Sequence, residues 1–285
     1  MFSNCSVRRK TVTLKTESEK VLEGKQKSFG VVVVTGGSSG IGKYFVHRLR
    51  MLESCATICN LSRTKPEDFF HDPHFHHFEC DLGKPDQLQS ATKRVVNQIE
   101  NCPGRILLVN NSGFGAYGVF PNPNLEEHLE MIDLNVKAVV HLTALLLPLL
   151  EKRGGAIVNI ASTAAFLPTP YMATYGATKA FLLNWGLALG EELKEKDVTV
   201  LTVCPGPTKT RFYKRAGFNE PVVSKNLELS VEEVVEVSLR AVRKQKKLAV
   251  PGVLNKILVA LAARLPRPFT ARIAERILRK YRLPN

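Results

Sequence analysis

The chain has 285 residues and a formal net charge of +14 at pH 7, with 40 Lys and Arg residues against 26 Asp and Glu residues. This length predicts one sizeable domain, and the hydrophobic fraction of 44% is ordinary for a globular protein. No apolar run reaches the roughly 18 residues of a membrane span, no signal-peptide core is present, and the six cysteines lack metal or disulfide spacing. We therefore expect a cytoplasmic protein with reduced thiols.

The start of the chain predicts a tail followed by a phosphate-binding turn. Residues 1–28 are polar without a clear period, so we expect a loosely ordered tail. Val31–Val34 indicate a buried strand, a glycine-rich turn follows, and a helical pattern begins at Lys43. Glycines let a backbone approach a pyrophosphate, and a helix N-terminus presents free N–H groups to it. We predict dinucleotide contacts from Gly36, Ser38, Ser39, Gly40, Ile41 and Gly42.

Strand-like and helical segments then alternate up to residue 250. The strand-like runs are near Gly30–Thr35, Ala56–Leu61, Phe75–Cys80, Arg105–Asn110, Ala156–Ala161, Val198–Val203 and Leu248–Val250, and the longest helical patterns are Leu125–Leu150 and Thr174–Lys196. This alternation predicts an α/β domain over residues 29–250, a Rossmann-type doubly wound parallel sheet of about seven strands with helices on both faces. The glycine turn, Asn111, Ser162 and Pro205 fall at strand carboxyl ends, so we expect them to converge on one crevice.

The residues after the second predicted strand bear on the choice between NAD(H) and NADP(H). An NAD site needs an acid about 20 residues past the glycines, which accepts hydrogen bonds from the ribose hydroxyls. The segment Asn60–Arg63 holds no acid. Arg63 would pair with a 2′-phosphate and Ser62 could add a hydrogen bond, so the local chemistry favours NADP(H). The alternative is that Arg63 is a solvated surface arginine.

Tyr175 and Lys179 lie four residues apart, and Ser162 lies thirteen positions before the tyrosine. Four residues make about one helical turn, so both side chains would project from the same face. A tyrosine has a pKa near 10, and a neighbouring cation lowers it towards the range useful for proton transfer. The Ser162 hydroxyl could donate to a carbonyl oxygen as charge develops on it. Taken alone, the spacing is more typical of a surface contact between helix neighbours.

Seven segments in order resemble the classical short-chain dehydrogenase/reductase family. They are its glycine motif (Thr35–Gly42), its adenine-side aspartate (Asp81), its Asn-Asn-Ala-Gly motif (Asn110–Gly113, with Ser112 for alanine), its helix asparagine (Asn135), its serine strand (Val158–Ser162), its tyrosine–lysine pair and its Pro-Gly motif (Pro205–Thr210). Ala161 and Ala165 replace frequent family residues outside the chemistry. Ser39 stands where many NADP(H)-using relatives carry a basic residue. The layout after residue 250 is similar to bacterial members of the DltE-like type.

This resemblance implies hydride transfer between NADP(H) and a carbonyl or alcohol. Tyr175 would protonate the developing alkoxide, Lys179 would lower the tyrosine pKa and hold the ribose, and Ser162 would orient the substrate oxygen. Asn135, at a kink in a long helix, would hold a water that links Lys179 to solvent. The family's remaining cofactor contacts would come from Asp81, Leu82, Asn111, Ser112, Gly113, Pro205, Gly206, Thr208 and Thr210. The resemblance also implies a homodimer or homotetramer built on the long helices.

Aromatic residues suggest the chemical character of the substrate, whereas the spacing of the histidines does not indicate a metal site. Phe212, Tyr213 and Phe218 lie in the expected substrate lid, and Phe166–Pro168 follow the serine, which suggests a lipophilic carbonyl compound. The alternative is that these aromatic residues pack in the hydrophobic core. The histidines between His71 and His77 indicate a loop that leads into the third strand, because no ligand set has structural-zinc spacing.

Most of the excess positive charge lies at the C-terminus, where thirteen Lys or Arg residues from Arg240 onward accompany one acid, Glu275. We expect residues 251–285 to form a basic amphipathic helical extension in which Thr270 caps a helix through Tyr281. It could dock on its own domain or a partner subunit, which we favour, or lie on an anionic membrane. Two other hypotheses stay open. One is a dinucleotide-binding scaffold without turnover, and the other, from charge alone and without a recognition motif, is a nucleic-acid-binding protein.

Overall fold

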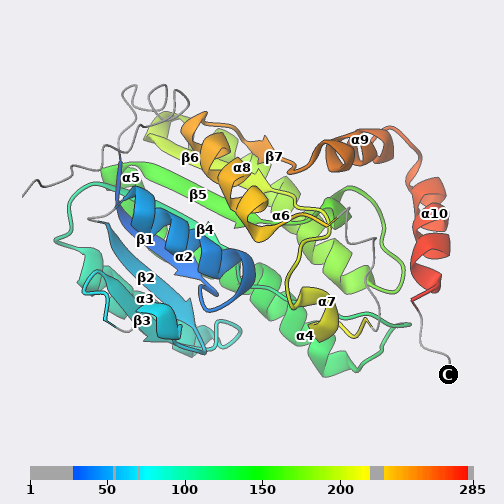
Figure 1. The fold of residues 1–285 in the computed structure, drawn as a ribbon, viewed down its shortest axis with the longest axis horizontal. Helices are drawn as coiled ribbons and strands as arrows, with labels where there is room; N and C mark the ends of the chain where they lie inside the picture. The colour runs from blue at the N-terminus through cyan, green and yellow to red at the C-terminus, as the bar shows by residue number, and fades with distance from the viewer. Residues whose placement is uncertain (1–27, 54–55, 70, 219–227, 282–285) are drawn as a thin grey trace, which may run out of the picture.

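The computed structural model describes residues 28–53, 56–69, 71–218 and 228–281, so the predicted tail lies almost wholly outside the described residues. Within these ranges, seven strands form one parallel sheet in the order β3-β2-β1-β4-β5-β6-β7 (Figure 1). The strands are β1 (Phe29–Thr35), β2 (Thr57–Ser62), β3 (Phe75–Glu79), β4 (Arg105–Asn110), β5 (Gly155–Ile160), β6 (Val198–Val203) and β7 (Leu248–Ala249). The predicted doubly wound parallel sheet is confirmed.

Helices cover both faces of the sheet. They are α2 (Gly40–Leu52), α3 (Pro85–Ile99), α4 (Leu125–Ile132), α5 (Ala138–Arg153), α6 (Ala173–Glu192), α7 (Phe212–Arg215) and α8 (Val231–Arg243), with short 3-10 turns η2 (Glu67–Phe69), η4 (Thr163–Phe166) and η5 (Lys194–Lys196). Two clusters of buried side chains hold these layers together. One joins α2 and α8 to the sheet, and the other joins α3 and α5 to its opposite face.

The valine run in β1 explains why the sheet has two cores. Successive strand residues point to opposite faces. Val32 and Val34 accordingly pack in the cluster with α2, whereas Val31 and Val33 pack in the cluster with α3, and all four are fully buried. An uninterrupted apolar strand is therefore what a central parallel strand requires.

The strand order places the candidate site. β1 lies between β2 and β4, so the chain crosses from one half of the sheet to the other beside the end of β1. In open α/β sheets, ligands bind in the crevice outside the strand carboxyl ends at this reversal. The glycine turn leaves β1 there, and the segments after β4, β5 and β6 leave the same edge.

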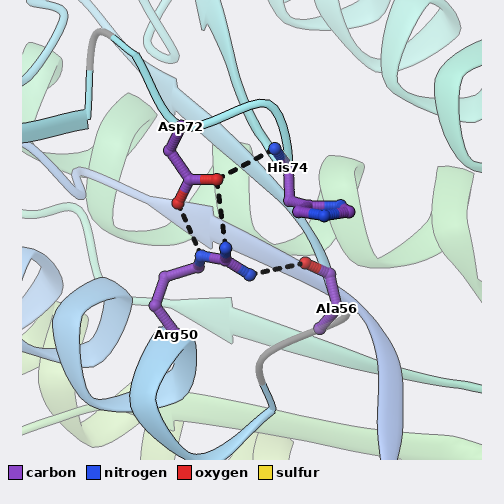
Figure 2. Close-up of polar contacts among 4 residues, drawn as sticks. All are labelled: Arg50, Ala56, Asp72 and His74. Carbon is purple, nitrogen blue, oxygen red and sulfur yellow. Dashed lines mark hydrogen bonds and ion pairs between the residues drawn. The ribbon is translucent and has the colours of Figure 1, made fainter. Parts of the chain in front are cut away.

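An arginine clamp fixes the far end of α2 against the β2–β3 half of the sheet (Figure 2). The Arg50 guanidinium donates to both carboxylate oxygens of Asp72, at 2.6 and 3.0 Å, and to the Ala56 carbonyl at 3.4 Å. Asp72 also accepts from the His74 backbone N–H at 2.9 Å. The clamp thus joins the last turn of α2 to the residue before β2 and to the turn before β3.

The long helix predicted over Leu125–Leu150 is present, and its kink has a defined cause. A π-turn, η3 (Asp133–Lys137), separates α4 from α5, and Asn135 lies at its centre. The continuous helical segment Leu125–Arg153 is long and apolar enough to cross a membrane by length and composition. Its residues Leu142, Leu146 and Leu150 are buried in the cluster with the sheet, as in the core helix of a globular domain.

Two helices, α9 (Val253–Ala262) and α10 (Arg267–Arg279), form the predicted extension and lie at one edge of the α/β body (Figure 1). The expected helix start at Thr270 is wrong. The cap residue is Pro266, and Pro268 occupies the first turn, where a missing N–H removes no helical hydrogen bond. Thr270 lies inside the helix, and its buried hydroxyl donates to the Arg267 carbonyl at 2.9 Å.

Candidate active site

The glycine turn after β1 has the geometry of an anion cradle. Gly36 has φ +68°, which L side chains rarely adopt, and a Cβ on Gly42 would overlap the Gly36 carbonyl. Helix α2 begins directly after Ser39, which makes no side-chain capping bond, and its first turn holds no acid. The first N–H groups of α2 are thus left for an anion. Because a Cβ would fill this cradle, the turn fits a dinucleotide pyrophosphate.

Thr35 joins the end of β1 to the segment after β4. Its hydroxyl accepts from the backbone N–H groups of Asn111 and Ser112, at 2.9 and 3.0 Å. The Asn111 side chain donates in return to the Thr35 carbonyl at 2.9 Å. Asn111 therefore positions two loops against each other, and the residues between Asn111 and Gly113 are held at the floor of the crevice.

Asn60 connects the glycine turn to the predicted ribose-binding segment. Its side-chain oxygen accepts from the Gly37 N–H at 2.8 Å, and its amide nitrogen donates to Ser62 Oγ at 3.0 Å. The Ser62 hydroxyl itself donates to the Thr64 carbonyl at 2.8 Å. A hydrogen bond from Ser62 to a 2′-phosphate, as predicted, would therefore require this internal bond to break.

Asp81 makes two hydrogen bonds with residues that follow it in the chain. Its Oδ1 accepts from the Gly83 N–H at 3.0 Å, and its backbone N–H donates to Gln87 at 2.8 Å. These two hydrogen bonds hold the loop at the position where the family resemblance expects contact with an adenine. Leu82, beside it, is buried.

These segments line one cleft of about 1180 Å³. Nineteen of the predicted site residues border it, namely Gly36, Ser38, Ser39, Gly40, Ile41, Ser62, Arg63, Asp81, Leu82, Asn111, Ser112, Gly113, Ser162, Tyr175, Lys179, Pro205, Gly206, Thr208 and Thr210. Two predicted residues do not. Gly42 packs behind the turn, and Asn135 is fully buried behind Phe114.

Helix α6 carries the tyrosine–lysine pair on the face that meets the cleft. The side chains of Tyr175 and Lys179 are both buried, and the Lys179 ammonium lies 5.7 Å from the centre of the Tyr175 ring. Lys179 donates to the Ile160 carbonyl at the end of β5 at 2.9 Å. Ser162, two residues after that strand end, hydrogen-bonds to the phenol. The three predicted side chains are therefore brought together, and a surface i,i+4 contact is excluded.

Burial works against the charged form of both members of this pair. It raises the pKa of Tyr175 to about 12, although the hydrogen bond from Ser162 acts to lower it. It lowers the pKa of Lys179 to about 8. Desolvation is therefore the larger effect on the Tyr175 pKa in the cofactor-free protein, and the expectation that Lys179 acts to lower this pKa stays a prediction. At neutral pH the pair consists of a neutral phenol and a cationic ammonium.

Asn135 orders the helix behind the pair. Its side chain accepts from the Phe114 N–H at 3.1 Å and donates to the Phe114 carbonyl at 2.9 Å and to Thr178 Oγ1 at 3.1 Å. Thr178 donates to the Tyr175 carbonyl at 2.7 Å. Three of the four hydrogen bonds that the Asn135 amide can make thus go to protein groups, and they link the loop after β4 to the turn that holds Tyr175 and Lys179.

Cations outnumber acids around the cleft. Its lining contains Lys43, Arg63, Lys84, Lys179, Lys209, Arg211 and Arg215, against Asp81, Glu130, Asp133 and Glu228. Arg63 is exposed and makes no hydrogen bond or ion pair with the residues that the structure describes. The pKa of Arg215 is lowered by burial and further by the charge of Arg63, so the two guanidinium groups repel each other. An anion bound beside Arg63 would offset this repulsion.

An aromatic cluster borders Tyr175. Phe212 lies 5.2 Å from the Tyr175 ring centre, and Tyr213 packs edge-on against Phe212 and Phe218. Phe212 and Tyr213 border the cleft, as predicted, whereas Phe218 is buried behind them. Phe166 packs with Ala161 and Leu182 in a separate cluster of the core. The predicted substrate wall at Phe166–Pro168 is thus absent from the cleft.

The histidine segment leads into the third strand as expected, with His71 and His74 before β3. His76 and His77 lie within β3, where the His77 ring contacts the Asn60 amide at 3.1 Å and His76 contacts Gln98 at 3.4 Å. Three positioning residues were missed, namely Thr35, Asn60 and Thr178. Thr35 and Asn60 lie inside the segments Thr35–Gly42 and Asn60–Arg63, and Thr178 lies between Tyr175 and Lys179, so adjacency to predicted site residues was the one signal for them.

Comparison with known proteins decides the family. A family model for short chain dehydrogenases matches residues 30–221. The chain belongs to this family. Its oxidoreductase class and dinucleotide-binding Rossmann fold are therefore those of a classical short-chain dehydrogenase/reductase.

Three relatives illustrate this membership. The uncharacterized oxidoreductase DltE of Bacillus subtilis is 29% identical over 220 residues, which cover 76% of this chain and 85% of DltE. A short-chain dehydrogenase from Sphingobium yanoikuyae, solved in complex with NADPH, is 27% identical, with a TM-score of 0.70 over 84% of this chain and 97% of that chain. A 3-ketoacyl-(acyl-carrier-protein) reductase from Brucella melitensis, complexed with NADH, shares the fold at 22% identity, with a TM-score of 0.68 over 80% and 96% of the two chains.

Proposed function

We propose that this oxidoreductase reduces a lipophilic carbonyl compound with NADPH. The observation that carries the proposal is the buried Tyr175–Lys179 pair beside Ser162, in the lining of a cleft with a glycine cradle. With its pKa raised to about 12, the phenol stays neutral well above pH 7, and a neutral phenol suits a proton donor in carbonyl reduction. The cofactor would supply the hydride.

The chain would hold the cofactor at several points. The glycine turn and the first turn of α2 would bind the pyrophosphate, and the carboxylate of Asp81 would face the adenine. The Lys179 ammonium, which has further donor hydrogens besides the one bonded to Ile160, would donate to the ribose. The Thr35–Asn111 bonds would keep the floor of the cleft rigid.

The proton transfer would run through Tyr175. Ser162 and Tyr175 would both donate to the substrate oxygen, and the phenol proton would move to that oxygen as negative charge develops on it. The positive charge of Lys179 would stabilise the phenolate left behind. The π-turn at Asn135, whose side chain holds Phe114 and Thr178, would leave the backbone beside Lys179 to bind a relay water.

Preference for NADPH over NADH would come from Arg63. This exposed guanidinium borders the cleft directly after β2, and no acid lies beside it in the segment Asn60–Arg63. Its positive charge lowers the pKa of Arg215. A 2′-phosphate would accept hydrogen bonds from Arg63, whereas a carboxylate at this position would repel it. Lys43, which also borders the cleft, pairs with Asp68 at 2.6 Å and contributes less free charge.

The lipophilic character of the substrate rests on the aromatic cluster. Phe212 and Tyr213 border the cleft next to Tyr175, so a carbonyl group near the phenol would bring its substituents against these rings. We further infer a homodimer or homotetramer, since Leu129, Ile132 and Phe181 on the long helices are each more than a third exposed. Cytoplasmic location and the division at residues 28 and 250 stay predictions.

A scaffold that binds dinucleotide without turnover is the second candidate, and Tyr175→Phe separates the two. This substitution removes the phenol proton and leaves the ring, so we expect NADPH oxidation to fall about 10²–10⁴-fold across a panel of hydrophobic ketones and aldehydes. NADPH binding, measured by calorimetry, should remain within a few-fold of wild type. Tyr213→Phe, on the same cluster, is the control for a lost hydroxyl. Equal turnover in wild type and Tyr175→Phe would refute the role of Tyr175.

A further inference from the structure

The C-terminal helices expose many large apolar side chains. Between 39% and 73% of each is exposed, and they are Val253, Leu254, Ile257, Leu258 and Leu261 on α9, Leu265 in the connection, and Phe269, Ile273 and Ile277 on α10. We call these residues the α9–α10 surface. Exposed apolar residues at one spacing, rather than scattered singly, indicate an interaction site.

Cations border this surface. At 100° per residue, Phe269, Ile273 and Ile277 form one stripe along α10, and Arg272 and Arg276 run beside it. Lys256 lies on α9, and Arg264 and Arg267 lie between and at the start of the helices. Among the described residues of the extension, the one acid is Glu275, which is already bound to Tyr171 and Arg279. Both helices therefore carry exposed apolar side chains with cations beside them.

The opposite face of α10 is fixed to the catalytic domain. Tyr171 donates to the Glu275 carboxylate at 2.7 Å, and Tyr117 donates to the Leu278 carbonyl at 2.6 Å. Tyr281 packs on Phe218 with ring centres 6.0 Å apart, and α9 contacts the η4 turn that follows Ser162. Docking on its own domain, one of the predicted outcomes, therefore holds α10 in an orientation that leaves the apolar stripe in solvent.

We propose that the α9–α10 surface binds an anionic lipid bilayer and anchors the enzyme at the membrane surface. Helix α9 is ten residues long, about 15 Å, which is half of a hydrocarbon core, so it would lie in the interface and not span it. The apolar side chains would enter the acyl boundary, and the bordering Arg and Lys residues would bind lipid phosphates. The neighbouring aromatic cluster would then lie close to the bilayer.

A second copy of the chain fits the same surface less well. A two-fold contact brings each patch against its own copy, so the cations of one copy would face those of the other. With Glu275 already engaged, no acid in the described part of the extension would offset that repulsion. Anionic lipid supplies the complementary charge, and the apolar stripe distinguishes a bilayer from nucleic acid, which would use the cations alone.

Vesicle flotation with the full-length protein tests the proposal without any need for turnover. The probes are vesicles of phosphatidylcholine alone and of phosphatidylcholine mixed with phosphatidylglycerol. We expect the protein to float with the mixed vesicles and to remain mostly unbound with the neutral ones. High salt should weaken the binding, since screening reduces attraction between the cations and the lipid.

Two variants divide the apolar and electrostatic contributions. Leu258→Glu with Ile277→Glu should reduce binding to the mixed vesicles at least about tenfold, because charges would enter the acyl boundary. Arg272→Gln with Arg276→Gln should reduce it by about tenfold or more. The matched controls are Met51→Glu, an exposed apolar residue on α2, and Lys93→Gln with Lys244→Gln. These should bind like wild type, and all variants should retain NADPH binding and unfolding temperature.

Four results would overturn the proposal. Absence of flotation with either vesicle would do so, as would equal flotation with both. Loss of self-association, rather than of vesicle binding, in Leu258→Glu with Ile277→Glu would assign the surface to a second copy. DNA binding that depends on Arg272 and Arg276 but not on the apolar stripe would assign the cations to nucleic acid. None of these results depends on whether the enzyme turns over a carbonyl substrate.

Discussion

At the scale of single residues, burial sets the protonation of the active site. Desolvation disfavours any charge, so it pushes the Tyr175 pKa upward and the Lys179 pKa downward, to about 12 and about 8. Below pH 8 the lysine keeps its proton and its charge. Between these two values both side chains are neutral, and the lysine can no longer stabilise a phenolate.

This ordering gives a directional pH dependence. The value of kcat/KM for NADPH, which reports ionisations of the free enzyme, should be flat below about pH 8 and fall above it as Lys179 loses its proton. Lys179→Arg keeps the charge throughout, since arginine does not deprotonate in this range. NADPH affinity of that variant, measured by calorimetry across the same pH range, should not decline. A decline identical to that of wild type would assign the ionisation to another group.

At the scale of elements, short polar links hold the segments that carry the site. The Asn60 and Thr35 bonds tie the glycine turn to β2 and β4, and the Arg50 clamp ties α2 to the starts of β2 and β3 (Figure 2). The Arg50 and Asp72 side chains are each less than a fifth exposed. A bidentate contact with restricted solvent access stabilises more than an exposed ion pair.

Removing the Arg50 clamp should therefore lower stability measurably. Arg50→Gln should reduce the free energy of unfolding by about 1–3 kcal/mol, because Asp72 and the Ala56 carbonyl lose charged donors. Urea unfolding provides the measurement. Lys137→Gln, which breaks the exposed pair between Lys137 and Asp133, is the control and should cost about 0.5 kcal/mol or less. A loss in Arg50→Gln no larger than the control's would show that the clamp contributes little.

The sequence was informative wherever a pattern is local. The valine run and the glycine turn each occupy a short segment, and β1 lies where it was expected, whereas α2 begins at Gly40 and not at the expected Lys43. The kink at Asn135, which the family resemblance implied, is the π-turn η3. Contacts between distant segments carry no such pattern. The Thr35–Asn111 bond spans 76 positions, and the raised pKa of Tyr175 depends on burial that several segments create together. Phe166 and Phe212 look alike in sequence, yet one packs in the core and the other borders the cleft.

At the scale of the whole molecule, positive charge falls in two separate places. Around the cleft, seven Lys and Arg residues accompany four acids, while the α9–α10 surface has its own cations beside it. The first suits an anionic cofactor and the second suits anionic lipid. Because Arg63 belongs to the first set and Arg272 to the second, substitutions at the two positions should act independently on cofactor binding and on vesicle binding.

The most direct measurement is calorimetric titration of the purified protein with NADPH and, separately, with NADH, for wild type and Arg63→Ala. We predict that wild type binds NADPH about 10–100-fold more tightly than NADH, and that Arg63→Ala removes most of this difference by weakening NADPH alone. Lys244→Ala, a surface cation after α8, serves as the matched control and should leave both affinities unchanged. Preference for NADH would contradict the role of Arg63, and binding of neither nucleotide would contradict the proposed enzyme.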